Sequence, residues 1–197
     1  MKKFDQITKN IEKNNGYLFC SEIESLGISR TYISEYIKAN NMEKVAKGIY
    51  ITNDTWPDEL FILQKKYPDI IYYGETALYL HQLIDREYSE IIVCVPRGFS
   101  GSRLRQKGIV IHQEKTETYE LGVTTVHTSL GNTVKTYNKE RCICDLIKNK
   151  NKIEIQNFQS AIKDYMRTKE KNLSQLVLYA EALKIRAEVM KYVEVLV

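Results

Sequence analysis

The chain has 197 residues, 43% of them hydrophobic, and a formal net charge of +4 at pH 7, so it can form two small domains or one larger one with a buried core. No apolar run reaches the ~18 residues that a membrane-spanning helix needs, and the N-terminus lacks the apolar stretch of a secretory signal. We therefore expect a cytoplasmic protein without a membrane partner. Because the net charge is modest, a surface for an anionic polymer would depend on where the cations lie rather than on their number.

The cysteines and histidines do not indicate a metal site. Cys20, Cys94, Cys142 and Cys144 have the spacing of neither a zinc ribbon nor a disulfide framework. We expect free and mostly buried thiols. The three histidines are far apart in the sequence, and each is more simply a packing or surface residue than a ligand. With no phosphate-binding loop or dinucleotide motif present, the sequence predicts no cofactor and no metal.

Two short helices joined by a tight turn are predicted between Cys20 and Asn40. Gly27 lies in the turn, and Ser29 stands at the N-cap position, where its side chain is expected to accept from the first free amides of the second helix. The apolar residues of that helix share one face at i, i+3 and i+4 spacing: Ile33, Tyr36 and Ile37. This pattern is typical of a helix-turn-helix.

A preceding helix over Phe4–Asn14 is expected to complete a three-helix core, with Tyr17–Phe19 packing into the next helix. The predicted core residues recur at helical spacing: Phe4, Ile7, Ile11, Ile23, Leu26, Ile33 and Ile37.

A β-hairpin is predicted directly after the helix pair. Met42–Val45 and Ile49–Thr52 are short runs of strand-forming residues, and Gly48 between them can take the positive φ of a tight turn. This hairpin would be a wing that carries Lys44 and Lys47. Together with the helix pair, it predicts a winged helix-turn-helix.

The polar face of the second helix and the hairpin lysines form the predicted DNA-contacting set: Arg30, Thr31, Ser34, Lys38, Lys44 and Lys47. Arg30 can bridge two acceptors of one guanine, whereas the lysines suit phosphates. The alternative is a small helical bundle with solvated charges. Agreement between turn, cap, face and hairpin favours DNA binding.

A second domain is expected after the polar segment Asn53–Thr55 and the break at Trp56–Pro57. The sequence thus predicts an α+β chain: a winged helix-turn-helix domain over residues 1–55, then a mixed α/β domain over 56–197 with a C-terminal helical part. Helices are expected over 58–67, 74–81 and 139–148, strands over 90–95, 109–112, 117–127 and 132–137, and the helical tail over 153–168, 173–184 and 187–196.

A second basic cluster lies between two predicted strands and contains Arg97, Arg103, Arg105 and Lys107. It could extend a DNA contact or bind an RNA or nucleotide phosphate. The simpler interpretation, an exposed connection in the sheet, is favoured.

An enzymatic alternative is a metal-dependent nuclease targeted by the wing. Glu90 and the Gln113-x-Lys115 motif loosely resemble the acidic and lysine elements that hold a metal and polarise a phosphate. The pattern lacks an acid at the end of the preceding strand, where Val95–Pro96 stands. We therefore expect no catalytic activity and keep the nuclease as the alternative.

Several stretches together resemble the AbiEi-type antitoxins of type IV abortive-infection toxin–antitoxin systems. The resemblance covers about Phe4 to Ile147, and no single motif is specific; the order and spacing of the motifs carry it. The matching segments are the turn Leu26–Ser29, the wing Lys44–Tyr50, the helix start Gly74–Leu78, the strand end Val93–Pro96 and the helix Glu140–Ile147.

The resemblance implies a phage-defence antitoxin that represses its own operon by binding double-stranded DNA at promoter inverted repeats. It also implies that the rest of the chain counteracts a co-encoded nucleotidyltransferase-like toxin without a stable complex. The family-motif residues of the second domain are Glu75, Arg141 and Asp145. Arg141 and Asp145, four apart, can pair along a helix or anchor it to the sheet near Glu75. A structural role is favoured for them.

Overall fold

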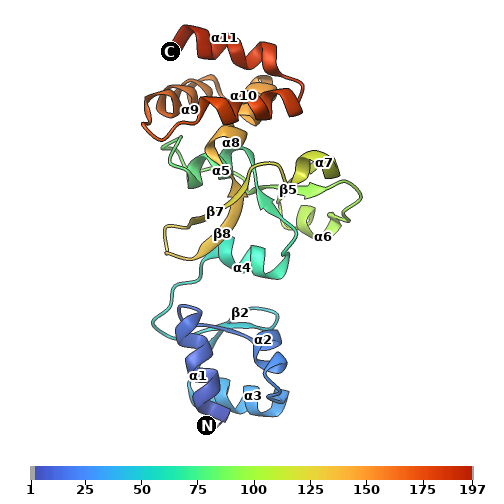
Figure 1. Cartoon of the computed structure of the whole chain (residues 1–197). Coiled ribbons are helices and arrows are strands. Elements are labelled where there is room, and N and C mark those ends of the chain that lie inside the picture. Colours follow the sequence, from blue (N-terminus) through green and yellow to red (C-terminus); the bar gives the residue numbers. More distant parts are fainter. Residues whose placement is uncertain (1–2, 197) are drawn as a thin grey trace. The chain divides into compact units, whose positions relative to one another are not determined.

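Two β-sheets organise the chain, one in each of two units. The computed structural model describes residues 3–196, and within that range it contains 11 α-helices and two sheets, which confirms the predicted mixed α and β class (Figure 1). One unit comprises Met1–Lys66 with Thr128–Asn132, and the other Tyr67–His127 with Thr133–Val197. No helix in the described part of the chain is long and apolar enough to cross a membrane.

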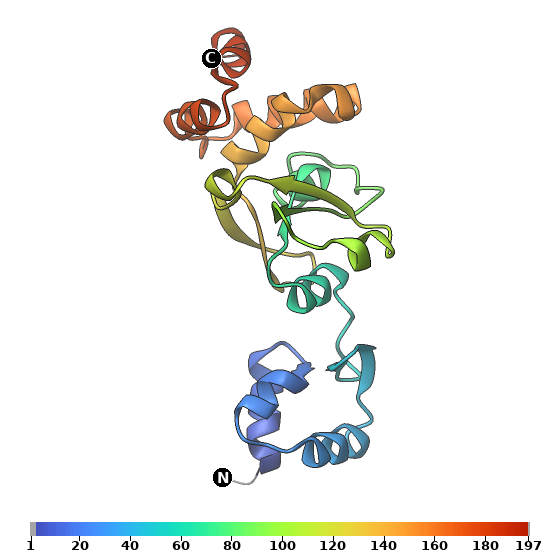
Figure 2. The same ribbon diagram turned by 90° about the vertical axis from the view of Figure 1, so that its right-hand side faces the viewer.

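Three helices build the core of the first unit: α1 (Lys3–Lys13), α2 (Cys20–Ser25) and α3 (Arg30–Ala39). They are the three blue helices of Figure 2. Their buried apolar residues form one cluster, and the predicted inner face of α3 is confirmed because Ile33 and Tyr36 are buried and Ile37 is partly buried. The cluster contains Ile7, Ile11, Leu18, Ile23, Ile28, Ile33, Tyr36 and Met42.

Two predicted core residues of this unit are exposed. Leu26 is 54% exposed and Phe4 is 37% exposed, whereas Ile28 is only 2% exposed. Leu26 is the C-cap of α2, and Gly27 follows it with a φ of +77°, so the chain reverses before it reaches Ile28. Leu26 was predicted to be buried on the assumption that the helix continues through it, but α2 ends at Ser25. Ile28, after the turn, is buried in the core instead.

The sheet of the first unit has three strands in the order β1-β3-β2. The hairpin of β2 (Glu43–Ala46) and β3 (Ile49–Ile51) is as predicted, with a φ of +75° at Gly48. The first strand, β1 (Tyr17–Phe19), pairs antiparallel with β3 and was not predicted. All three of its residues are buried, so it shows none of the polar–apolar alternation that identifies a half-buried strand.

The first unit continues past Thr55, where the sequence predicted the domain boundary. Helix α4 (Glu59–Lys66), which lies within the predicted helix over 58–67, buries Leu60, Phe61 and Leu63. The Tyr17 hydroxyl donates to the Trp56 carbonyl at 3.1 Å and accepts the Asp58 amide at 2.8 Å, and the Phe61 ring packs edge-on against Tyr17 at 5.0 Å. These contacts join the start of α4 to β1.

Asp58 also attaches a distant turn to this unit. Its Oδ1 accepts the Phe61 amide at 3.1 Å, and its Oδ2 accepts the Thr128 hydroxyl at 2.5 Å and the Asn132 side-chain amide at 2.9 Å. A single buried carboxylate thus caps α4 and holds the turn over residues 128–132, a contact across more than sixty positions that sequence periodicity cannot reveal.

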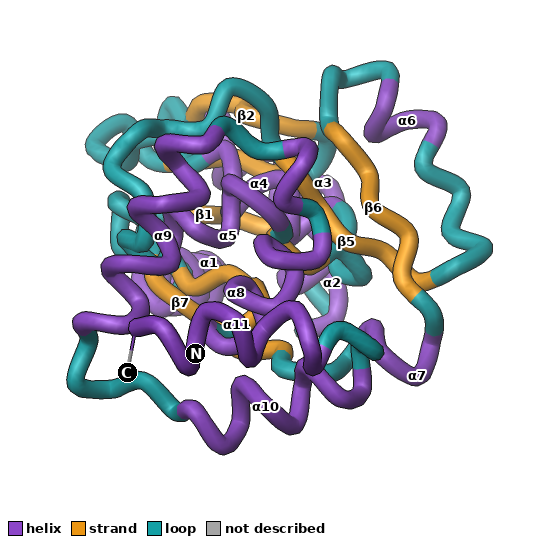
Figure 3. Tube along the Cα trace, turned by 90° about the horizontal axis from the view of Figure 1, so that it is seen from above, coloured by secondary structure: helices purple, strands orange, loops and turns teal. Residues whose placement is uncertain are grey.

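The second unit contains a five-stranded mixed sheet in the order β6-β5-β4-β8-β7. The pairs β5–β6 and β4–β8 are parallel, and β4–β5 and β7–β8 are antiparallel. The strands are β4 (Ile71–Tyr72), β5 (Ile92–Pro96), β6 (Val110–Glu114), β7 (Val123–His127) and β8 (Thr133–Tyr137). Two short helices flank this sheet, α6 (Ser102–Arg105) beside the outer strand β6 (Figure 3) and α7 (Thr116–Tyr119).

Helices pack on this sheet and continue as the C-terminal part, broadly as predicted: α5 (Gly74–Leu80), α8 (Lys139–Lys148), α9 (Ile155–Arg167), α10 (Leu173–Ala182) and α11 (Arg186–Leu196). Helix α8 is central, because its residues from Glu140 to Ile147 are all buried. Its apolar side chains share one core with α5, α9 and α10. The four cysteines are free, and all but the partly buried Cys20 are buried, which confirms the prediction.

Leu26 is exposed and Ile28 is buried, so alanine substitutions at these two positions form a matched pair. Ile28→Ala should lower the free energy of unfolding by about 2–5 kcal/mol, because it leaves a cavity in a closed cluster. Leu26→Ala should change it by no more than about 0.5 kcal/mol. Urea denaturation of the full chain followed by circular dichroism measures both, and equal losses would contradict the packing described here.

Candidate functional site

The predicted DNA-contacting residues lie on the solvent side of α3 and on the β2–β3 hairpin. All six are exposed: Arg30, Thr31, Ser34, Lys38, Lys44 and Lys47. The core holds the opposite face of α3 through Ile33 and Tyr36, whose hydroxyl is 2.9 Å from the Thr8 hydroxyl on α1. The polar face of α3 is therefore fixed in orientation by packing, and it is free to contact a partner.

Arg30 makes an ion pair inside the unit. Its Nε lies 2.6 Å from Oε1 of Glu24 on α2, and its Nη2 lies 3.4 Å from Oε2. The pair lowers the pKa of Glu24, chiefly through the hydrogen bond from Arg30. Because the Arg30 side chain is 87% exposed, solvent screens this pair and it contributes little to stability. A phosphate or a base edge could replace Glu24 as the acceptor.

The predicted cap at Ser29 is only partly present. Ser29 occupies the N-cap position of α3 with extended backbone angles, but its side chain makes no capping hydrogen bond. Its carbonyl accepts the Ile33 amide at 3.2 Å. Because Ser29 and the first residues of α3 are exposed, water can satisfy the first free amides of the helix, and so can an anion at this N-terminus.

The second basic cluster lies on the connection between β5 and β6. Arg97, Arg103, Arg105 and Lys107 are all exposed, and Arg103 and Arg105 belong to α6. The connection contains the short helix α6, whose Leu104 is buried.

The structure does not bring the nuclease-like residues together. Gln113 pairs with Val95 on β5, five positions beyond Glu90, which is on the order of 15 Å along a strand. Glu90 lines a cavity beside His112, whereas Gln113 donates its side-chain amide to the Phe99 carbonyl at 3.3 Å. Within residues 3–196, no group of three or more histidine, cysteine, aspartate or glutamate residues is placed to hold a metal ion.

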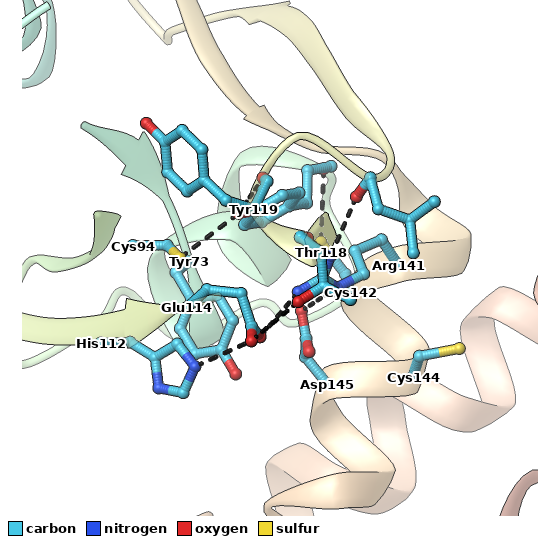
Figure 4. Close-up of polar contacts among 12 residues, drawn as sticks. Tyr73, Cys94, His112, Glu114, Thr118, Tyr119, Arg141, Cys142, Cys144 and Asp145 are labelled. Carbon is cyan, nitrogen blue, oxygen red and sulfur yellow. Dashed lines mark hydrogen bonds and ion pairs between the residues drawn. The ribbon is translucent and has the colours of Figure 1, made fainter. Parts of the chain in front are cut away.

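A buried ion cluster ties α8 to the sheet (Figure 4). Arg141 is completely buried, and its Nε donates to Oδ2 of Asp145 at 2.8 Å, as the i,i+4 spacing predicted. Its Nη2 donates to Oε2 of Glu114 at 3.1 Å. Its Nη1 donates to the carbonyls of Thr118 at 2.6 Å and Leu121 at 3.0 Å. The guanidinium thus fixes α8 against the end of β6 and the segment that follows it.

Sequence reasoning missed Glu114. Glu114 lies between Gln113 and Lys115, the two residues that the nuclease motif selected, but it is the one that points at Arg141. Glu75, expected near the Arg141–Asp145 pair, lines the same cavity as Asp145, and its Oε1 accepts the Asn157 side-chain amide at 2.7 Å. A buried guanidinium needs more than one carboxylate or carbonyl partner. If Arg141 is taken as buried, this requirement predicts a second acidic partner besides Asp145.

The two carboxylates of the cluster differ in protonation behaviour. Burial raises the pKa of Asp145 to about 6, although Arg141 acts against that rise. For Glu114, burial is outweighed by hydrogen bonds from the Lys115 amide and the Thr118 hydroxyl and by nearby cations, so its pKa is lowered. Burial also lowers the pKa of His112, whose ring stacks on Tyr73 at 4.4 Å.

No protein-family model and no curated protein matches the sequence. Among solved structures, the chain is similar to the crystal structure of the RV2827C protein from Mycobacterium tuberculosis. The TM-score is 0.54 at 8% sequence identity, and the similarity covers 92% of this chain and 72% of that chain. At this identity the likeness concerns the fold alone.

The environment of Asp145 predicts an unusual titration. Its folded-state pKa lies above the ordinary value of 3.8, so the unfolded chain releases this proton first, and the group lowers the free energy of unfolding as the pH rises from about 4 to about 6. Carbon-13 NMR of the carboxyl groups should give a midpoint near pH 6 for Asp145 and one below the ordinary value for Glu114. An Asp145 that is already ionised at pH 5 would contradict this assignment.

Proposed function

We propose that the chain is a DNA-binding autorepressor and antitoxin of a phage-defence toxin–antitoxin operon. In this proposal the first unit is a winged helix-turn-helix that binds inverted repeats in the promoter of its own operon. The second unit counteracts a co-encoded nucleotidyltransferase-like toxin without forming a stable complex with it. The chain has no catalytic activity in this account.

One observation carries the DNA-binding part. Helix α3 buries Ile33 and Tyr36 and presents Arg30, Thr31, Ser34 and Lys38 to solvent, and the hairpin that follows it exposes Lys44 and Lys47. A recognition helix needs this division, because the core must fix the helix while its outer side chains reach base edges and phosphates. The order of helix pair and hairpin in the first unit also supports the proposal.

The antitoxin part rests on the resemblance of the sequence to AbiEi-type antitoxins. Two of the three family-motif residues in the second unit, Arg141 and Asp145, belong to the buried cluster that anchors α8. This placement supports a role in holding the second unit together, and it assigns neither residue to chemistry on a substrate.

The hairpin lysines should contribute to binding of any DNA sequence. Lys44→Ala with Lys47→Ala should lower the salt dependence of binding by about two units, at roughly 0.9 per phosphate contact. As a control of equal charge, Lys163→Ala with Lys191→Ala in the second unit should leave the slope unchanged. Fluorescence anisotropy over a salt series measures it, and an unaltered slope in the hairpin variant would remove the hairpin from the interface.

Arg30 should read a base. Arg30→Lys keeps the charge and loses the planar pair of donors, so it should cost about 1–3 kcal/mol on the operator and leave affinity for random DNA nearly unchanged. Glu24→Gln releases Arg30 from its ion pair and should not weaken operator binding. Affinities for both duplexes are measured at one salt concentration, beside a thermal melt. Equal losses on the two duplexes would show that Arg30 reads no base.

The two activities should separate. A chain carrying Arg30→Ala, Lys44→Ala and Lys47→Ala should lose repression of its promoter and still protect cells that express the neighbouring toxin. Arg141→Met should lose protection and keep repression. It leaves two buried carboxylates without their guanidinium in the second unit and does not alter the first unit. A promoter-reporter assay and a toxin-rescue assay measure the two activities. Loss of both activities in the first variant would contradict the division of roles.

A further inference from the structure

A cavity of about 330 Å³ lies in the second unit, beside the buried ion cluster. Side chains from α5, β5, β6 and α8 and from the segment after α8 line it. Its size falls at the lower end of the range of about 300–1,000 Å³ that small-molecule sites occupy. Neither the DNA-binding face nor the role of the cluster as an anchor requires such a cavity.

One acceptor in the lining has no partner. Asp145 gives its Oδ2 to Arg141, but its Oδ1 is buried without a hydrogen bond among the described residues. Asp145 is only 4% exposed, and it lines the cavity. Leaving a buried carboxylate oxygen without a hydrogen bond is unfavourable. A molecule in the cavity that donates a hydrogen bond to Oδ1 of Asp145 would remove this cost.

The charge of the lining selects the kind of donor. Three carboxylates line the cavity, those of Glu75, Glu90 and Asp145, against one ammonium, that of Lys152. Arg141 lies next to the cavity, but its N–H groups donate to Glu114, Asp145 and two backbone carbonyls. The lining therefore holds more carboxylates than cations, and of the three carboxylates only Asp145 is paired with Arg141 and also lies near Lys148.

The remaining lining is suited to an organic ligand rather than to a metal ion. Ile92, Leu146 and Ile153 contribute apolar surface that can hold methylene groups. The lining carboxylates come from different elements, and they do not form a cluster that could hold a metal within residues 3–196. A flexible chain that carries a cationic end matches this combination of acids and apolar side chains.

We infer that this cavity binds a small organic cation with N–H donors, of the amine or guanidinium class, which donates to Oδ1 of Asp145. Glu75 and Glu90 attract the charge, and the apolar residues hold the methylene chain. The inference concerns the second unit alone, and it does not depend on DNA binding by the first.

Isothermal titration calorimetry near neutral pH tests the site, with agmatine and 1,4-diaminobutane as cationic probes. We expect saturable one-site binding of at least one of them, and no binding of the equally long neutral 1,4-butanediol or of the anion glutarate. Absence of saturable binding for both cations at millimolar concentration would overturn the inference. Equal binding of 1,4-butanediol would overturn the assigned charge.

Variants then locate the binding. Glu90→Lys places a cation in the lining at an exposed position and should weaken binding roughly tenfold or more. Glu87→Lys, in the same connection but outside the lining, changes the net charge equally and should bind as the unmodified chain does. Equal affinities in these two variants would place the cation elsewhere and overturn the inference.

The conservative Asp145→Asn variant tests the orphan oxygen directly. Its amide can keep an oxygen toward Arg141 and then turns N–H groups toward the cavity, so the cation should no longer bind. A thermal melt checks that this variant is folded, and the Glu90 and Glu87 pair keeps the test decisive if it is not. Unchanged binding in a folded Asp145→Asn variant would contradict the role of Oδ1.

Discussion

The second unit depends on the burial of one guanidinium. Arg141 has no exposed surface, and it exchanges water for two carboxylates and two backbone carbonyls. Removing such a group from water costs several kcal/mol, so the arrangement is stable only while all of these partners stay in place. The partners come from α8 itself, from the end of β6, from α7 and from the segment between α7 and β7. These contacts fix the position of α8 on the sheet. They thereby also fix the positions of the helices that pack on α8.

The same ion cluster creates the conditions for the proposed ligand site. Two carboxylates share one guanidinium, so one of them keeps an oxygen without a donor. Glu114 satisfies its oxygens with the Lys115 amide, the Thr118 hydroxyl and Arg141. Asp145 has no such supply for its Oδ1, and burial raises its pKa. In the proposed ligand site, Asp145 is both an anchor of α8 and the acceptor that the ligand contacts.

Sequence patterns predicted what depends on near neighbours. The buried face of α3, the hairpin turn at Gly48 and the Arg141–Asp145 pair all follow from spacings of a few residues, and the structure has them. What the patterns missed depends on distant contacts. The pairing of β1 with β3 joins Tyr17 to Ile51, Asp58 holds the turn at Thr128, and Glu114 meets Arg141 across the unit. Ile28 replaces Leu26 in the core because the turn at Gly27 ends the helical spacing, a local event that periodicity alone does not register.

The central claim is that the first unit binds operator DNA through the outer face of α3 and the hairpin. Hydrogen–deuterium exchange of the full chain, free and with its promoter duplex, tests this claim without altering any residue. The account predicts slower exchange in peptides that cover residues 29–38 and 43–49, with a smaller effect for a scrambled duplex and none in α9–α11. Protection confined to the second unit, or none on any duplex that the protein binds, would contradict it.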